Sequence, residues 1–131
     1  MSGKKHKVKG DKYERDLARI FTARLGLPVE RAPLSGGGAI GIFVGGADLI
    51  GTPGLHVEAK RVERAAWPEW LRQAEASIAK TRAPELPVVI NRTNGMKDED
   101  SYCMVRLSHF LDLYRAWLFF NGYIGSSDEN D

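Results

Sequence analysis

The sequence predicts an α/β protein in which helices flank a mixed β-sheet, with elements in the order α-β-β-β-α-β-β-α. Three observations predict this class. Apolar residues recur at helical spacing near both ends of the chain and once in its middle. Short segments bounded by Gly, Pro, Asn and Asp read as strands between them. One segment, "PVVINR", is almost wholly apolar, which is typical of a central strand covered on both faces.

The first helix is expected over residues 11–26, "DKYERDLARIFTARLG". Asp11 is suited to the N-cap, because its carboxylate accepts hydrogen bonds from free backbone N–H groups. Gly26 is suited to the position that follows the last helical turn. One apolar stripe runs along this helix, formed by Tyr13, Leu17, Ile20, Phe21 and Leu25.

Three short strands are expected next. Residues 27–32 form the first of these strands. In residues 33–46, "PLSGGGAIGIFVGG", the apolar residues show neither helical nor alternating spacing. We expect a glycine-rich loop there. The other two strands, 48–51 and 55–60, are expected to pair through the turn "GTPG".

A second helix is expected to begin near Pro68, which suits the first helical turn. Residues 87–92 and 102–107 are the last two strands. Ser108 is expected to cap a third helix over residues 109–120.

The chain of 131 residues is long enough for one domain. We expect a basic flexible arm over residues 1–10, one domain over 11–124 and an acidic disordered tail over 125–131. Most charge runs are solvated termini, whereas contact with a polyanion is the alternative explanation of the arm. The arm and its junction with the domain carry Lys4, Lys5, Lys7, Lys9 and Lys12.

Several classes of protein are excluded by what the sequence lacks. No apolar run is long enough to span a bilayer, and no apolar stretch follows the basic N-terminus as in a signal peptide. The expected location is therefore the cytoplasm. Cys103 is alone and the histidines show no zinc spacing. The run from Gly36 to Gly41 matches G-x-G-x-x-G but follows no strand and opens no helix, so no nucleotide cofactor is expected.

Three charged residues lie in the expected hairpin. Side chains alternate along a strand, so Glu58 and Lys60 share one face of residues 55–60, opposite the apolar Val57 and Ala59. Asp48 reaches that face if the two strands pair. The ordinary explanation of a lone E-x-K is an ion pair on an exposed face, and His56 on this face is interpreted as an incidental surface residue.

A fourth charged residue favours a functional explanation. Glu14 lies at the margin of the buried stripe of the first helix, where a carboxylate is unfavourable unless a cation or donor meets it. Two or three carboxylates and a lysine are the groups that divalent-metal phosphodiester hydrolysis needs.

The order of these residues resembles the PD-(D/E)XK nuclease superfamily. Glu14 precedes Asp48, then comes Glu58-Ala59-Lys60, and Gln73 lies on the next helix. Within the superfamily the chain is most similar to archaeal-type Holliday-junction resolvases and their phage relatives. This likeness rests on small size, the opening "KGDKYERDLARIF", a serine ahead of the aspartate and the absence of a specificity domain. Ala47 stands where the family name has proline.

The resemblance implies a restriction-endonuclease-like fold and a role for each matched residue. Asp48 and Glu58 would bind Mg²⁺, for which Mn²⁺ would substitute, together with the backbone carbonyl of Ala59. Lys60 would be catalytic, and Glu14 would bind or support the metal through water. Two further roles are implied: Ser35 near the scissile phosphate and Gln73 behind the site.

The activity implied is Mg²⁺-dependent cleavage of four-way DNA junctions by a homodimer, because resolution requires paired nicks. Arg61, Arg64 and Arg72 flank the site as candidate phosphate contacts. The third helix is apolar on more than one face, as a dimer interface would be. Two alternatives stay open: another nuclease of the superfamily that cuts linear DNA, and a DNA-binding protein that has lost the chemistry.

Overall fold

The computed structural model describes residues 2–33 and 46–125, with side chains described from Val8 onward. The predicted order of helices and strands is confirmed, with one additional 3₁₀ helix. The elements are α1 (Ser2–Leu25), β1 (Glu30–Arg31), β2 (Leu49–Ile50), β3 (Leu55–Lys60), α2 (Trp67–Thr81), β4 (Leu86–Asn91), the 3₁₀ helix η2 (Asp98–Asp100), β5 (Tyr102–Met104) and α3 (Leu107–Phe120).

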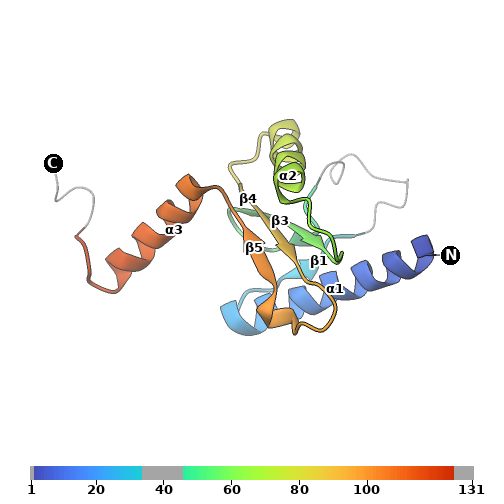
Figure 1. The fold of residues 1–131 in the computed structure, drawn as a ribbon. Coiled ribbons are helices and arrows are strands. Elements are labelled where there is room, and N and C mark those ends of the chain that lie inside the picture. Colours follow the sequence, from blue (N-terminus) through green and yellow to red (C-terminus); the bar gives the residue numbers. More distant parts are fainter. Residues whose placement is uncertain (1, 34–45, 126–131) are drawn as a thin grey trace.

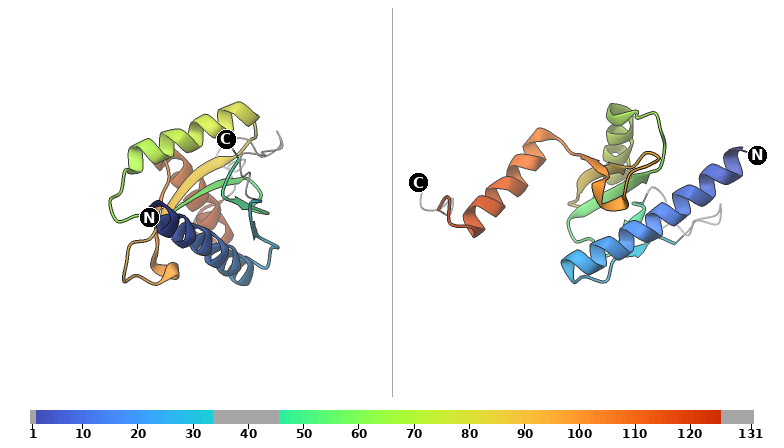
Figure 2. Two further views of the ribbon diagram at one scale, coloured as in Figure 1. Left: turned by 90° about the vertical axis from the view of Figure 1, so that its right-hand side faces the viewer. Right: turned by 60° about the horizontal axis from the view of Figure 1, so that its bottom comes forward.

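A mixed sheet of three strands forms the centre of the molecule, in the order β3-β4-β5. β3 and β4 are parallel, and β4 and β5 are antiparallel. The helices α1 and α2 lie on opposite faces of this sheet (Figures 1 and 2). β1 and β2 form a small antiparallel pair beside it. The predicted mixed sheet flanked by helices is therefore confirmed.

The alternation of side chains along β3 and β4 creates two apolar layers. On the α1 side, Val57, Val88 and Ile90 pack with the apolar stripe of α1, which includes Leu17. On the other side, buried Val89 lies level with Glu58 on β3. Every β4 residue from Pro87 to Asn91 is buried, as predicted for a central strand.

Two predicted helix starts differ from the structure. α1 begins at Ser2, so the prediction of a helix start at Asp11 was wrong. The lysine-rich segment before Asp11 has good helix propensity, which lets the helix extend toward the N-terminus. α3 begins at Leu107 with Arg106 as its N-cap, two residues before the cap predicted at Ser108. The expected tail after residue 125 and the loop over residues 34–45 lie outside the described residues.

The expected hairpin also differs, because β2 forms its ladder with β1 instead of β3. Glu30 pairs with Ile50 and Arg31 with Leu49. Gly51 allows this close approach: its φ is +89°, and a Cβ there would lie 2.4 Å from the carbonyl oxygen of Pro28. The outer edge of β3 is therefore left without a continuous partner strand among the described residues.

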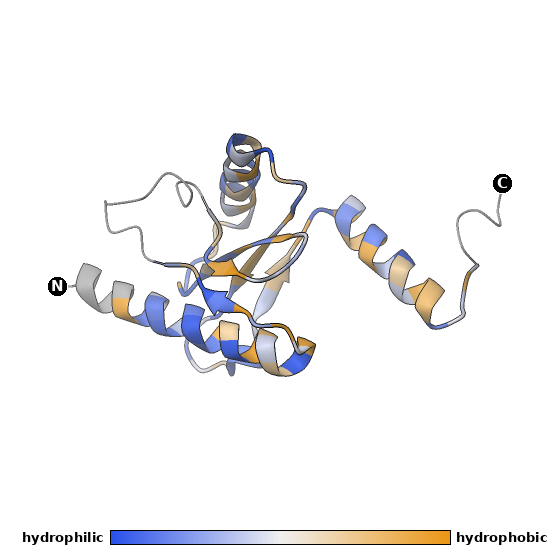
Figure 3. Ribbon diagram, turned by 180° about the vertical axis from the view of Figure 1, so that it is seen from behind, coloured by the Kyte–Doolittle hydropathy of each residue, from blue (hydrophilic) through white to orange (hydrophobic). Residues whose placement is uncertain are grey.

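The helix α3 lies apart from the rest of the molecule, on the side opposite the N-terminus (Figure 1). None of its residues is buried. Its last turns carry a high density of apolar residues (Figure 3). No helix in the described ranges is long and apolar enough to cross a bilayer.

Candidate functional site

The candidate site is built where Asp48 docks onto the outer edge of β3. The backbone N–H of Asp48 donates to the carbonyl of Val57 at 2.8 Å. The Asp48 carboxylate accepts a hydrogen bond from the N–H of Ala59 at 2.7 Å. Both polar backbone groups of a strand residue point to the same edge, so the carbonyl of Ala59 lies on this edge too. Two predicted site residues, Asp48 and Ala59, are thus in direct contact.

The carboxyl group of Asp48 lies in an unfavourable electrostatic environment. Burial and the nearby carboxylate of Glu58 raise the pKa of Asp48 to about 8, while the N–H of Ala59 acts in the opposite direction. Glu14 raises it further at longer range. The structure therefore brings Asp48 and Glu58 together, as the sequence predicted, and leaves their combined negative charge poorly compensated. A cation would stabilise this arrangement.

Glu14 has a partner that the sequence did not identify. Arg31 donates from Nε to Glu14 Oε2 and from a terminal nitrogen to Asp11 Oδ1, both at 2.7 Å. Burial raises the pKa of Glu14, and the hydrogen bond and charge of Arg31 lower it. This guanidinium is the cation that a carboxylate at the margin of the core requires. Glu14 therefore lies within electrostatic range of Glu58, but its carboxylate is bound to Arg31.

His56 is buried, so the interpretation of this residue as an incidental surface histidine was wrong. Its side chain is only 3% exposed, and Nε2 lies 2.7 Å from Glu58 Oε1. Because a carboxylate only accepts, the ring nitrogen is the donor. The face of β3 that carries His56 is covered from the α2 side, which explains the burial. Its two-residue spacing from Glu58 was the signal in the sequence.

Lys60 is positioned by an aromatic ring and by the chain that follows it. Its ammonium nitrogen lies 5.8 Å from the ring centroid of Trp70 on α2, within cation–π range. The buried amide of Asn91 accepts from the N–H of Val62 at 3.1 Å and donates to the carbonyl of Val62 at 3.2 Å.

Gln73 is exposed on α2, and its side chain makes no hydrogen bond among the described residues.

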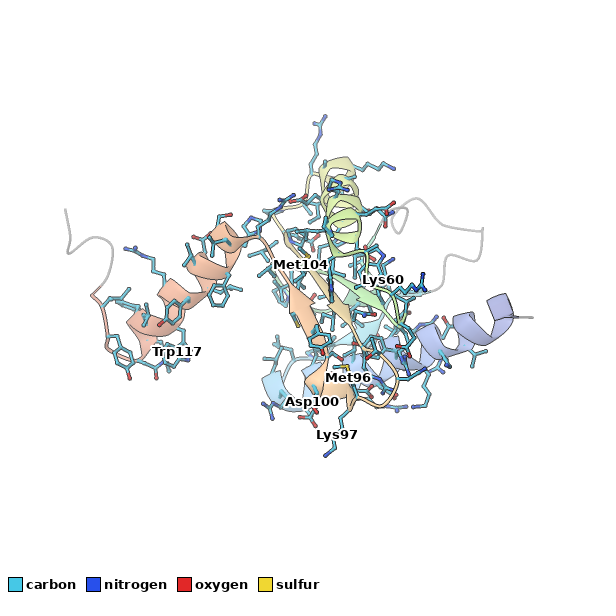
Figure 4. All side chains as sticks on the ribbon, viewed as in Figure 1. Lys60, Met96, Lys97, Asp100, Met104 and Trp117 are labelled. Atoms are coloured by element: carbon cyan, nitrogen blue, oxygen red, sulfur yellow. The ribbon has the colours of Figure 1, made fainter. Side chains whose placement is uncertain are left out.

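Some of the predicted nucleic-acid contacts gather in one place. Lys9, Lys12 and Arg61 line a cavity of about 230 Å³ together with Arg92. Arg61 donates to the side-chain oxygen of Asn94 at 2.9 Å, so its guanidinium is held by a neutral acceptor. Figure 4 shows Lys60 on the side of the molecule where α1 approaches the end of β3.

The other predicted site residues are not brought to this cavity. Arg64 and Arg72 are exposed, and neither lines it. Ser35 and the side chains of Lys4, Lys5 and Lys7 lie outside the described residues.

The donor set fits a hard divalent cation with few protein ligands. Within the described residues, no three His, Cys, Asp or Glu side chains are arranged to hold a metal ion. The two carboxylates of Asp48 and Glu58 and the Ala59 carbonyl are oxygen donors, and Mg²⁺ commonly binds through one or two carboxylates plus waters. The raised pKa of Asp48 is the observation that favours a cation here.

Comparison with known proteins agrees with this geometry. The model of a family described as phage putative PDDEXK endonuclease matches residues 5–119, from near the start of α1 to near the end of α3. No curated protein and no solved structure was found to match the chain. The match spans most of the sequence and contains the carboxylates and the lysine of the candidate site. The chain therefore belongs to the phage putative PDDEXK endonuclease family.

Proposed function

We propose that this nuclease is a metal-dependent, structure-selective DNA endonuclease that resolves four-way junctions by paired nicks. The observation that carries the metal-dependent part is the contact of Asp48 with the edge of β3 beside Glu58. Junction selectivity is supported by the absence of a base-reading element among the described residues. Contacts with backbone and shape then dominate recognition.

Each residue of the site has a role in this proposal. Asp48, Glu58 and the carbonyl of Ala59 would hold Mg²⁺ or Mn²⁺. A divalent cation lowers the pKa of a bound water and neutralises charge on the phosphate. Lys60 would orient the attacking water or accept its proton, with Trp70 fixing the direction of its side chain. Glu14 would act at a distance, through the Arg31 network that stabilises the site.

DNA would approach from the side of the basic cavity. Lys9, Lys12, Arg61 and Arg92 supply positive charge there, although Asp16 and Asp98 pair with Lys12 and Arg92. Of the four cations that line this cavity, Arg61 and Lys9 form no ion pair among the described residues, so we propose that they contact phosphates. Such contacts are salt-dependent and independent of sequence.

The decisive experiment offers the protein a labelled synthetic four-way junction and a linear duplex of matched sequence, with Mg²⁺ or with EDTA. We expect symmetric nicks on the junction, none on the duplex and none in EDTA. The nicks are mapped on denaturing gels for each strand.

Two outcomes would replace the proposal. Equal cutting of junction and duplex would favour a general nuclease of the same superfamily. Binding of DNA without metal-dependent cleavage would favour a DNA-binding protein that has lost the chemistry.

The contact between His56 and Glu58 leads to a prediction about metal affinity. His56→Phe fills a similar volume but removes the donor to Glu58, so we expect about 10- to 100-fold weaker metal binding. The Mg²⁺ dependence of the cleavage rate measures this effect. Most of the rate should return at saturating Mg²⁺.

His56→Gln serves as the matched variant, because glutamine retains a donor. It should recover part of the metal affinity. An unchanged Mg²⁺ dependence in a His56→Phe protein that still unfolds cooperatively would show that His56 has no influence on Glu58.

A further inference from the structure

The helix α3 presents an apolar surface that its own chain leaves exposed. Among the described residues none of α3 is buried, and Arg106, the residue that caps its N-terminus, forms a bidentate ion pair with Glu75 on α2. A helix that is this apolar is normally covered. Its large exposed side chains are Leu107, Phe110, Leu111, Leu113, Tyr114, Trp117, Phe119 and Phe120, followed by Tyr123.

Four of these side chains form one stripe. Leu107, Phe110, Tyr114 and Trp117 follow one another at spacings of three and four, so they lie on the same side of the helix. The rings are also in register. Phe110 and Tyr114 stack at 5.9 Å between centroids, Tyr114 and Trp117 at 6.1 Å, and Trp117 and Tyr123 at 5.8 Å. We name this row of side chains the aromatic stripe.

The charges of α3 argue against a nucleic acid as the occupant of the stripe. A surface for DNA would interleave aromatic rings with several cations. Between Leu107 and Phe120, however, Asp112 balances Arg115. By helical geometry Asp112 lies opposite the aromatic stripe, and Arg115 lies about 120° around the helix from its centre. The stripe itself contains no charged side chain, so its occupant should be apolar too.

The size of the stripe matches the contribution of one partner to a stable dimer. Aromatic side chains carry about 150–250 Å² each. Because the stripe residues are about half exposed or more, the stripe with its flanking Leu113, Phe120 and Tyr123 presents on the order of 800 Å². A standard protein–protein interface takes about 800 Å² from each partner.

We propose that α3 is a dimerisation arm, in which the aromatic stripes of two copies of this chain pack on each other about a two-fold axis. A stripe of this kind is self-complementary: apolar positions of one copy meet apolar positions of the other along the whole helix. In the antiparallel arrangement Phe110 faces Trp117 of the second copy, and Leu113 faces Tyr114. The lack of charge on the aromatic stripe and its area favour a second copy of this chain as the occupant.

This arm lies well apart from the candidate site, as the positions of Trp117 and Lys60 in Figure 4 show. The inference deepens the proposed function, since paired nicks need two sites. It is tested without DNA or metal, however, so failure of one proposal is distinguishable from failure of the other. A protein that dimerises but does not cut would leave the arm intact and refute the nuclease proposal alone.

The test is the molar mass in solution, measured by light scattering or sedimentation at micromolar protein. The wild type is expected to have twice the mass of one chain. Trp117→Glu and Phe110→Glu place a charge at either end of the stripe, and each should give a monomer. Phe119→Glu is the matched control: Phe119 is 52% exposed and Trp117 53%, yet they are about 160° apart around the helix.

The control should remain a dimer. Thermal unfolding followed by circular dichroism shows whether each variant keeps a folded domain, since the arm contributes little to the core. A monomeric wild type would overturn the proposal. So would dissociation by Phe119→Glu to the same extent as by Trp117→Glu, because the charge would then act without regard to the stripe.

Discussion

Lys60→Met is expected to lower the rate of DNA cleavage by roughly 10²- to 10⁴-fold, the range that positioned proton transfer contributes in enzymes. The substitution keeps most of the aliphatic stem and removes the ammonium group that lies over Trp70. Stability should change little, because Lys60 makes no ion pair within the described residues. Single-turnover cleavage of the preferred substrate measures the effect.

Lys97→Met is the matched control for the loss of one positive charge. Lys97 lies beside η2, away from Lys60 (Figure 4). It should lower cleavage only slightly, through weaker long-range attraction of DNA. If both variants lost activity equally, the effect of Lys60 would be general electrostatics instead of chemistry at the site. Full activity of Lys60→Met would remove Lys60 from the mechanism.

Asp48→Asn is expected to abolish cleavage while making the metal-free protein more stable. Burial and Glu58 raise the pKa of Asp48 from its ordinary 3.8 to about 8, so the folded protein binds the proton more tightly than the unfolded chain. Stability is therefore highest when Asp48 is protonated, and it falls as the pH rises between 3.8 and about 8. The loss is about 6 kcal/mol at most.

Asparagine removes this loss because it is neutral at every pH in that range. Its side-chain oxygen accepts from the N–H of Ala59, and its amide donates to Glu58. Urea unfolding in EDTA at a series of pH values should show a flatter profile for Asp48→Asn and higher stability at neutral pH. Added Mg²⁺ should stabilise the wild type and leave the variant unaffected.

Asp100→Asn controls for the loss of an exposed aspartate. Asp100 belongs to η2 and lies far from Lys60 (Figure 4). Its pH profile should follow that of the wild type. If Asp48→Asn also gave a wild-type profile, ionisation of the Asp48 carboxyl would not lower the stability of the folded protein. The argument for a cation at this place would then fail.

Local patterns were sufficient to predict the elements of the fold. The apolar run of β4 identified the central strand, and helical spacing identified all three helices. The alternation along β3 was enough to place Glu58 and Lys60 on one side. These features depend on the period of side chains along the backbone, which can be read from neighbouring residues.

Contacts between distant segments could not be read in this way. Arg31 meets Glu14 across seventeen residues of sequence because β1 packs along α1. His56 looked exposed because the cover that α2 gives to β3 is a tertiary property. The pairing of β2 with β1 depends on a glycine with positive φ beside Pro28, which local turn chemistry did not distinguish from a hairpin.

The docking of Asp48 on β3 has a consequence for the solubility of the folded protein. An open strand edge offers unpaired N–H and C=O groups to any other chain, and exposed edges are common starting points for aggregation. Asp48 occupies the carbonyl of Val57 and the N–H of Ala59, two of the groups that an incoming strand would use. The same residue that we place at the metal thus occupies the sheet edge that self-association would use.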